Sequence, residues 1–462
     1  MLRVCQAVRE SGGRAVLVGG WVRDWLRGFE SKDFDLEVYG LDAAKLRSVL
    51  ESIARVNTVG EHFSVYKLVF RRDVQDLPEL GDVGPLTQQV EMDVSIPRRE
   101  SKSGRGHRAF IIEGDPSMTP EEAARRRDFT INAVMYDPLT DEMIDPFDGA
   151  KDLEQGVLRA VAADTFVEDS LRVLRAVQLA ARFEMTIEPR TAELCRTMDL
   201  SDLPAERIWG EIEKLLSLAE RPSIGLRASL DLKVLHKLFP ELVALAGNET
   251  NGPSAPDSSG FTHTALSLDQ AVILARSLSK PERITLMIAT LCHDLGLAGG
   301  ASPSRDSGGV EQVAVKRASA VLKTLGVHTI AGYDVRSQVL ALVREQLRPA
   351  QFYESRQGVS DGDFRRLAQK VDIDLLYRVA KACALAREGE ASLAVDWFIE
   401  RARELGVEHG PPKPLLLGRH LIEAGYEPGP RMGQILREVY EFQLDGTVRT
   451  LDEALAHLAR LP

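Results

Sequence analysis

The hydrophobic positions of the chain change their spacing at about residue 160. Before that point, short apolar runs of alternating pattern are mixed with stretches of helical period, whereas almost everything after it has the helical period. Strands are predicted at residues 14–20, 34–39, 64–70 and 90–96, and helices at 21–28 and 42–55. The sequence therefore predicts an α+β fold, with an N-terminal head built on a mixed sheet and followed by an all-helical body.

Three breaks in the helical half mark predicted domain boundaries. The first lies near residue 222, the second is the loop-like segment "GNETNGPSAPDSSG", and the third is "GVEHGPPKP". The predicted domains are a head at 1–150, a helical neck at 151–222, a helical domain at 223–405 and a small C-terminal helical module at 406–462.

The bulk composition limits the class of protein. A chain of 462 residues, of which 44% are hydrophobic, is long enough for roughly two to four domains with real cores. Its net charge of −11 excludes a uniformly basic nucleic-acid binder. Any contact with nucleic acid therefore has to come from a local basic face.

The cysteines and the first residues predict a cytoplasmic protein. The four cysteines are far apart and form no CxxC pair, which is typical of reduced thiols in the cytosol. The start "MLRVCQAVRES" is too polar for a signal peptide, and no apolar run is long enough to span a membrane. We therefore expect no membrane partner.

Two aspartates in the strand region are the first chemical candidates. Asp33 and Asp35 are two residues apart, so in a strand they face the same side while Phe34 faces the core. Parallel carboxylates repel unless a cation lies between them, and Mg²⁺ prefers such hard oxygen ligands. Asp93, on a neighbouring predicted strand, is a possible third ligand. The alternative is a polar face of an edge strand, which a bare DxD more often indicates.

The glycine pair before these aspartates favours a nucleotide site. Gly19 and Gly20 end a predicted strand and precede a helix, so their backbone N–H groups are placed to cradle a phosphate. A lone Gly-Gly pair is a weak signal. A strand, two glycines, a helix and a DxD flanked by apolar residues together indicate a nucleoside triphosphate activated by metal ions.

Several motifs carry a resemblance to a known family. The stretches "GGWVRD" and "KDFDLEV" resemble the opening signature of the class II tRNA nucleotidyltransferases and bacterial poly(A) polymerases. Similar stretches follow in the family's order: "PRRESKSGRGHRAF", "RRDFTINAVMYDPLTDEMIDPFDGAKDLEQGVLRAV", "FVEDSLRVLRAVQLAARF" and "AERIWGEIEKLL". The C-terminal "LLLGRHLIEAGYEPGPRMGQILREVYEFQLDG" resembles a tail found in part of the family. The resemblance covers most of the chain.

The resemblance implies roles for residues of the head and neck. Asp33 and Asp35 would be the catalytic metal ligands, and the basic run Arg98–Arg108 is a candidate for contact with the RNA backbone or for a loop. The alternative for the arginines after residue 125 is a solvated run beside a helix. The expected nucleotide-binding residues are Gly19, Gly20, Arg23, Asp24, Arg126, Arg127, Asp128, Asn132, Asp169, Arg172 and Arg175.

Within this set, Asp169 and Arg172 are expected to read the base. Both are predicted to lie on one face of a helix at 168–183. By the resemblance, the carboxylate accepts from the amino group of cytosine or adenine and the guanidinium donates to the adjacent ring nitrogen. Uracil and guanine present the opposite order, so each would leave a polar group unpaired. The alternative is an ordinary salt-bridge ladder on the helix surface.

A second chemical pattern lies in the helical body. "FTHTALSLDQA" and "ATLCHDLG" resemble the start of an HD phosphohydrolase domain, which would make His263, His293 and Asp294 metal ligands. The pattern is incomplete, because Leu297 stands where a Lys often follows and Cys383 stands where that family often has an Asp. We therefore expect a degenerate HD site in an inert scaffold, with a working metal site as the alternative.

Together these features predict template-independent addition of C and A to the tRNA 3′ end from CTP and ATP, with Mg²⁺ as cofactor. The expected partners are the tRNA 3′ end, ATP and CTP. A poly(A) polymerase, or an enzyme that adds only part of CCA, shares the same motifs. An HD-type metal-dependent phosphohydrolase and a catalytically dead RNA-binding scaffold are alternatives of other classes, and the Asp33/Asp35 pair disfavours the scaffold.

Overall fold

The computed structural model describes residues 1–29, 34–58, 65–72, 88–102, 110–246, 260–297, 308–388 and 393–458. The chain forms two compact units, Met1–Pro204 and Ala205–Pro462. The first contains a mixed sheet and the second is almost entirely helical, which confirms the predicted α+β class. The four domain ranges derived from the sequence stay a prediction.

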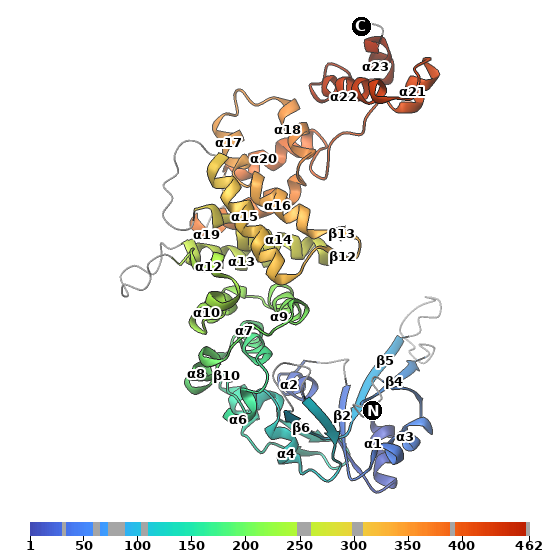
Figure 1. The fold of residues 1–462 in the computed structure, drawn as a ribbon, viewed down its shortest axis with the longest axis vertical. Coiled ribbons are helices and arrows are strands. Elements are labelled where there is room, and N and C mark those ends of the chain that lie inside the picture. The colour runs from blue at the N-terminus through green and yellow to red at the C-terminus, as the bar shows by residue number, and fades with distance from the viewer. Residues whose placement is uncertain are drawn as a thin grey trace. The chain divides into compact units, whose positions relative to one another are not determined.

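The first unit contains the sheet, which is followed in the chain mainly by helices (Figure 1). Its strands are β1 (Arg14–Leu17), β2 (Phe34–Tyr39), β3 (Arg55–Thr58), β4 (Val65–Arg72), β5 (Gln88–Ser95), β6 (Arg98–Lys102), β7 (Phe110–Gly114), β8 (Met135–Asp137), β9 (Glu142–Ile144), β10 (Val157–Leu158) and β11 (Thr186–Ile187). Its helices are α1 (Leu2–Glu10), α2 (Gly20–Leu26), α3 (Ala43–Glu51), α4 (Pro120–Arg125), the 3₁₀ turn η2 (Thr130–Asn132), α5 (Gly149–Glu154), α6 (Ala163–Phe166), α7 (Leu171–Phe183) and α8 (Pro189–Thr197).

The main sheet of this unit has the strand order β3-β4-β5-β2-β1-β8-β9 among the described residues. Its strands pair antiparallel except β2 and β5, which run parallel. The register of that parallel pair places Asp35 opposite Asp93. The topology therefore brings together two carboxylates that are distant in the sequence.

The two faces of this sheet have different chemistry, because successive side chains of a strand point to opposite faces. Leu36 and Val38 of β2 lie on the apolar face, which α1 and α3 cover. Asp35 and Glu37 alternate with them and face the other side, where a pocket lies. The core of the apolar face includes Val4, Val8, Ala15, Leu17, Leu46, Leu50, Leu68, Met92 and Val94.

The observed elements differ from the predicted ones mainly at their ends. The helix predicted at 42–55 ends at Glu51, and the residues after it form β3 instead. Val56 of this strand pairs with Leu68 and packs against the core, so a tertiary contact forms a strand that the sequence analysis did not predict. The helix itself begins where Asp42 accepts a hydrogen bond from the Lys45 N–H at 2.8 Å.

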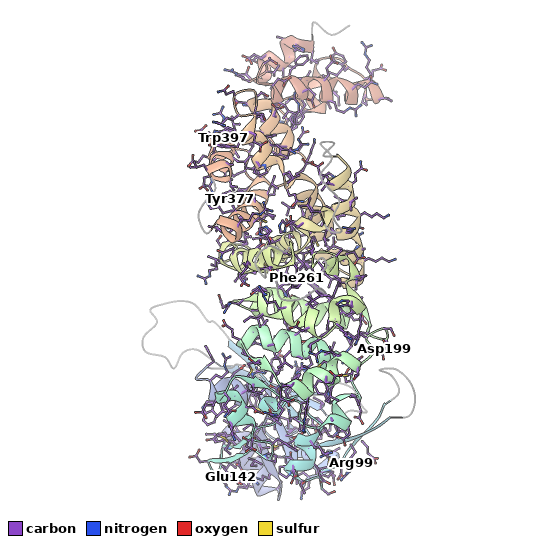
Figure 2. All side chains as sticks on the ribbon, turned by 90° about the vertical axis from the view of Figure 1, so that its left-hand side faces the viewer. Arg99, Glu142, Asp199, Phe261, Tyr377 and Trp397 are labelled. Atoms are coloured by element: carbon purple, nitrogen blue, oxygen red, sulfur yellow. The ribbon has the colours of Figure 1, made fainter. Side chains whose placement is uncertain are left out.

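The second unit consists of packed helices. They are α9 (Ala205–Leu218), α10 (Pro222–Asp231), α11 (Val234–Leu238), α12 (Pro240–Val243), α13 (Gly260–Leu274), α14 (Lys280–Cys292), the 3₁₀ turn η4 (His293–Gly296), α15 (Gly308–Leu325), α16 (Val335–Glu345), α17 (Arg348–Glu354), α18 (Asp361–Ala368), α19 (Ile373–Glu388) and α20 (Leu393–Glu404). A short hairpin, β12 (Thr329–Ile330) with β13 (Tyr333–Asp334), connects α15 to α16. Phe261 of α13, labelled in Figure 2, is 3% exposed among these helices. Within the described residues, no helix is both long and apolar enough to cross a membrane.

The last three helices form a small core of their own. They are α21 (Gly418–Glu423), α22 (Pro430–Leu444) and α23 (Leu451–Leu458). Leu421, Val439 and Ala454, one from each helix, are almost fully buried in this cluster. Each helix alone is too short to be stable in water, so the shared core stabilises all three.

Gly149 lies where α5 packs against η2, and we expect that no larger residue can replace it there. A Cβ added at Gly149 would overlap the carbonyl oxygen of Thr130 and come within 2.7 Å of Val134 Cγ2. We expect Gly149→Ala to destabilise the first unit by about 1–3 kcal/mol or more, because the core has to shift. Gly210→Ala is the control, since a Cβ there meets nothing within 4 Å and alanine favours the helix. Calorimetric unfolding of the full chain measures both, and equal transitions for the two variants would contradict the prediction.

Candidate active site

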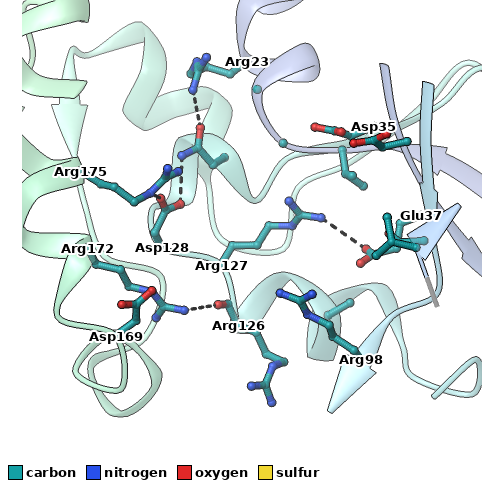
Figure 3. Close-up of a pocket in the computed structure, with 18 of the residues that line it drawn as sticks. Arg23, Asp35, Glu37, Arg98, Arg126, Arg127, Asp128, Asp169, Arg172 and Arg175 are labelled. Carbon is teal, nitrogen blue, oxygen red and sulfur yellow. Dashed lines mark hydrogen bonds and ion pairs between the residues drawn. The ribbon is translucent and has the colours of Figure 1, made fainter. Parts of the chain in front are cut away.

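A pocket of about 530 Å³ lies in the first unit, on the polar face of the sheet (Figure 3). Strands β2 and β5 provide one wall, and the start of α7 with the segment between α4 and η2 provides the other. Six arginines and five carboxylates line it, which is a composition suited to a polyanion together with a cation. The lining residues are Val18, Gly19, Gly20, Arg23, Asp35, Glu37, Val65, Asp93, Ser95, Ile96, Arg98, Ala123, Arg126, Arg127, Asp128, Asn132, Asp169, Arg172 and Arg175.

The strand wall provides candidate metal ligands. Asp35 and Asp93 are direct neighbours across the parallel pair, and both line the pocket. Like charges at such positions destabilise a sheet. The nearby ammonium of Lys67 lies 2.9 Å from Glu91 but 3.9 Å from Asp93. Two carboxylates on rigid strands offer the hard oxygen ligands that Mg²⁺ prefers, so the described residues fit such an ion.

The glycine turn closes the pocket beside these carboxylates. Gly19 has φ 70° and ψ −137°, a backbone conformation that favours glycine. A Cβ at this position would lie 3.4 Å from Arg127 Nη1 and 3.6 Å from Asp35 Oδ2. The Val18 N–H donates to the Asp35 carbonyl at 3.0 Å, which ties the turn to β2. The backbone of Gly19 therefore lies directly between a carboxylate and an arginine of the pocket.

A buried chain of hydrogen bonds supports the opposite wall. Arg23 Nη1 donates to Asn132 Oδ1 at 2.8 Å, and Asn132 Nδ2 donates to Asp128 Oδ1 at 3.0 Å. Arg175 Nε donates to Asp128 Oδ2 at 2.6 Å. Arg23, Asp128 and Asn132 are all at most 7% exposed. This network, drawn with dashed lines in Figure 3, connects α2, η2 and α7, and it holds their pocket-lining side chains in fixed positions.

Asp128 is ionised within this network. Burial alone would raise the pKa of the Asp128 carboxyl. The charge of Arg175 and the hydrogen bonds from Asn132 and the Phe129 N–H outweigh burial, so the pKa lies below its ordinary value of 3.8. The ion pair therefore contributes its full stabilisation above that ordinary value and loses it as the pH falls through the lower, folded-state pKa.

Arginines extend from the middle of the pocket towards the strands. Arg127 Nη2 lies 3.5 Å from Glu37 Oε2, so the carboxylate orients this guanidinium. Glu37 also accepts a hydrogen bond from the Tyr39 hydroxyl at 2.9 Å. Arg98, at the start of β6, lies in the same part of the pocket (Figure 3). These guanidinium groups are placed to contact phosphate oxygens bound near Asp35.

Asp169 and Arg172 lie at the other end of the pocket, at the start of α7 (Figure 3). The helix begins at Leu171, so the helix predicted at 168–183 starts three residues too early. Asp169 precedes the helix because its Oδ1 accepts from the Leu171 N–H at 3.1 Å, which forms a local turn. Arg172 donates to the carbonyl oxygens of Thr165 at 2.6 Å and Arg126 at 2.7 Å. Two fixed acceptors set the plane of this guanidinium.

Most of the residues predicted from the sequence come together here. Every predicted nucleotide-binding residue except Asp24 lines the pocket, and so do Asp35 and Asp93. Asp24 instead pairs with Arg23 at 2.8 Å and supports it. Asp33 lies outside the described residues. Sequence reasoning missed Glu37, although the period-2 pattern places it on the same strand face as Asp35.

The HD-like residues lie in the second unit and belong to a different cluster. Asp294 Oδ2 is 3.2 Å from His293 Nε2 and 3.8 Å from His263 Nε2. The structure therefore brings the three predicted ligands together. Cys383 lies in the same group.

Two family models match this chain. The model described as "Poly A polymerase head domain" covers residues 15–159, which include the main sheet except Arg14 and most of the pocket. The model described as "Probable RNA and SrmB- binding site of polymerase A" covers residues 184–245. The matches therefore fall on the head and on the helical segment that follows it.

Similar proteins agree with these matches. The Multifunctional CCA protein of Xanthomonas campestris pv. campestris (strain B100) is 37% identical over 289 residues, which are 61% of this chain and 63% of the relative. The chain thus aligns with less than two thirds of that relative's length. In fold, the chain resembles a CCA-adding enzyme solved with CTP (TM-score 0.64, 19% identity, 99% of this chain and 93% of the other covered). It also resembles the Thermotoga maritima CCA-adding enzyme complexed with tRNA (TM-score 0.60, 19% identity, 99% and 94% covered).

The sequence motifs, the matched head and the relatives agree with one another. At 19% identity the solved structures show the fold alone, whereas the relative at 37% identity and the head model rest on the sequence itself. Residues 15–159 therefore match the poly(A) polymerase head family, and the chain is similar to proteins called Multifunctional CCA proteins.

Proposed function

We propose that the pocket of the first unit binds CTP or ATP and transfers the nucleotide to an RNA 3′-hydroxyl, adding C and A to the 3′ end of tRNA. The reaction joins the hydroxyl oxygen to the α-phosphorus and releases pyrophosphate. The observation that carries the proposal is that one pocket holds paired strand carboxylates, an arginine group and the Asp169/Arg172 pair. The relative called a Multifunctional CCA protein supports the choice of tRNA as the RNA.

Each wall of the pocket has its own part in this reaction. Asp35 and Asp93, with Asp33, would hold Mg²⁺. The ion would activate the RNA hydroxyl and stabilise charge on the leaving group. Arg127 and Arg98 bind the triphosphate oxygens, and the Gly19 backbone allows a phosphate to approach the strand wall closely. Glu37 keeps Arg127 oriented before the nucleotide binds.

The start of α7 selects the base. Asp169 accepts from the amino group of cytosine or adenine, and Arg172 donates to the neighbouring ring nitrogen. The Thr165 and Arg126 carbonyls hold the Arg172 guanidinium in one plane, so it is oriented before a base arrives. A base with the reversed donor and acceptor order leaves both protein groups unsatisfied and is rejected.

Addition to trimmed tRNA tests the function directly. The full chain is incubated in Mg²⁺ with tRNA that ends before CCA, after the first C, or after the second C, and with each nucleoside triphosphate separately. We expect C, then C, then A, and no incorporation of U or G. A run of A added to any RNA from ATP alone would instead indicate a poly(A) polymerase. Hydrolysis of phosphomonoesters without incorporation would indicate a phosphohydrolase. The cytoplasmic location expected from the sequence stays a prediction.

The first variant tests the carboxylate wall. Asp35→Asn keeps the shape of the side chain and removes its charge, so we expect C and A addition to fall by roughly a thousandfold or more with the fold intact. Glu91→Gln is the matched control, because Glu91 lies on β5 near Asp93 but outside the pocket lining, and we expect nearly normal rates. Rates come from single-turnover addition, and circular dichroism checks the fold. Near-normal turnover of Asp35→Asn in Mg²⁺ would refute the assignment.

The second variant tests base selection. Arg172→Ala removes the donor that faces the ring nitrogen, so the penalty against uracil should shrink. A hydrogen bond to a charged group contributes about 1.5–3 kcal/mol, so the ratio of kcat/KM for CTP over UTP should drop roughly tenfold to a hundredfold. Arg190→Ala, on the exposed surface of α8, is the control and should leave the ratio unchanged. An unchanged ratio in Arg172→Ala would mean that this arginine only supports the loop carbonyls.

A further inference from the structure

Four potential metal ligands converge in the second unit, whereas the pocket described above belongs to the first. His263 lies on α13, His293 begins η4 and Cys383 lies on α19. One ligand atom from each of these three lies within 4.8 Å of the other two. Asp294 Oδ2 joins them, 3.2 Å from His293 Nε2 and 3.8 Å from His263 Nε2. The described part of the chain thus brings two imidazoles, a thiol and a carboxylate to one point.

The nitrogens of the cluster lack ordinary hydrogen-bond partners among the described residues. His293 is 4% exposed, and its Nδ1 lies 2.7 Å from the Thr290 carbonyl, which requires a proton on Nδ1. His293 Nε2 and both ring nitrogens of His263 make no hydrogen bond of normal geometry there. Buried polar atoms in this state cost free energy. When the imidazole is neutral with its proton on Nδ1, the lone pair on Nε2 lies 3.2 Å from Asp294 Oδ2, and a cation between the two atoms would remove that cost.

The geometry of the two imidazoles suits a tetrahedral ion. Their ring centroids are 5.2 Å apart and their planes are inclined by 71°, so they approach one point from different directions. Two ligand atoms on one zinc ion lie roughly 3.5 Å apart, given bond lengths of about 2.0–2.3 Å. The distances from Asp294 to the two imidazoles already have this size. Cys383 Sγ lies within 4.8 Å of a ring nitrogen of each imidazole.

The surrounding packing holds the cluster in place. Gln346 Nε2 donates to the His293 carbonyl, and Arg317 donates to the Leu295 carbonyl at 2.6 Å. A Cβ at Gly296 would lie 2.8 Å from Val310 Cγ1, so η4 packs tightly against α15. Ligands on a rigid turn lose little entropy when they bind an ion. His263 and Asp294 keep 12% and 11% of their side-chain surface exposed, which leaves a route for a small ion.

We propose that His263, His293, Cys383 and Asp294 form a site for a thiophilic divalent metal ion of the Zn²⁺ class. A thiolate with two imidazoles favours Zn²⁺ and its Co²⁺ substitute over Mg²⁺ or Mn²⁺. Four protein ligands fill a tetrahedral shell and leave no position for a reacting water. The site is therefore structural, unlike a hydrolytic HD centre. The proposal does not rest on the function assigned to the first unit.

A cysteine binds such an ion as the thiolate. Binding of the metal releases the protons that the imidazoles and any remaining thiol carry.

Metal titration of the full chain tests the site. The purified protein is stripped with a chelator and titrated with Co²⁺ alone, and then with Zn²⁺ in competition. We expect one ion per chain, a sulfur-to-cobalt charge-transfer band in the near ultraviolet, and displacement of Co²⁺ by Zn²⁺ but not by excess Mg²⁺. Zn²⁺ should also raise the unfolding temperature of the second unit.

Paired cysteine variants locate the ligand. Cys383→Ala should lose the charge-transfer band and weaken Zn²⁺ binding by roughly a hundredfold, whereas Cys195→Ala, which removes a buried thiol of the first unit, should keep both. Cys383→Ser, a smaller structural change, should also lose the band. A folded wild-type protein that takes up no Co²⁺ or Zn²⁺ would overturn the proposal in favour of a thiolate–imidazolium pair. A band that survives in Cys383→Ala would overturn it as well.

Discussion

The parallel pairing of β2 with β5 is the interaction on which the candidate active site depends. It places Asp35 beside Asp93 in a sheet whose other pairs are antiparallel. A parallel pair needs a long crossover connection, and here α3, β3 and β4 provide it. Since α3 packs on the apolar face, that face is covered and the carboxylate face remains available for the pocket. The juxtaposition of these two carboxylates is therefore a direct consequence of the topology.

The arginine side of the pocket needs a different kind of support. Guanidinium groups facing one cavity repel one another, so each needs a partner that fixes it before a nucleotide arrives. Arg23 and Arg175 are fixed through Asn132 and Asp128, inside the protein. The polar network is satisfied along its length, which makes it a rigid connection between the glycine turn and α7. Because the glycine turn lies beside Asp35 and α7 carries Arg172, this network would couple the proposed triphosphate site to the proposed base site.

The sequence predicted the parts of this site that follow a short-range rule. Alternation along β2 placed Asp35 on a polar face, and the same rule would have found Glu37. Such rules cannot predict contacts between segments that are distant in the sequence. β3 was not predicted, apart from Arg55, which was placed at the end of the preceding helix, and its pairing with β4 makes it a strand. Asp24 pairs with the buried Arg23, a countercharge that no spacing rule indicates, and its expected role at the nucleotide stays a prediction.

The cluster of His263, His293 and Cys383 shows this limit of short-range rules more clearly, because its residues come from three helical segments. In the sequence, Cys383 was noted only because it stands where the HD family often has an Asp, and this favoured an inert scaffold. In the structure the Cys383 thiol lies beside two imidazoles. A Cys in place of the Asp therefore changes which metal ion the residues suit, and it does not by itself remove the site. The hard carboxylates of Asp35 and Asp93 and the soft thiolate of Cys383 would then bind different metal ions in the same cell. A chain with both centres can keep its catalytic metal exchangeable in one unit while a tightly held ion stabilises the other.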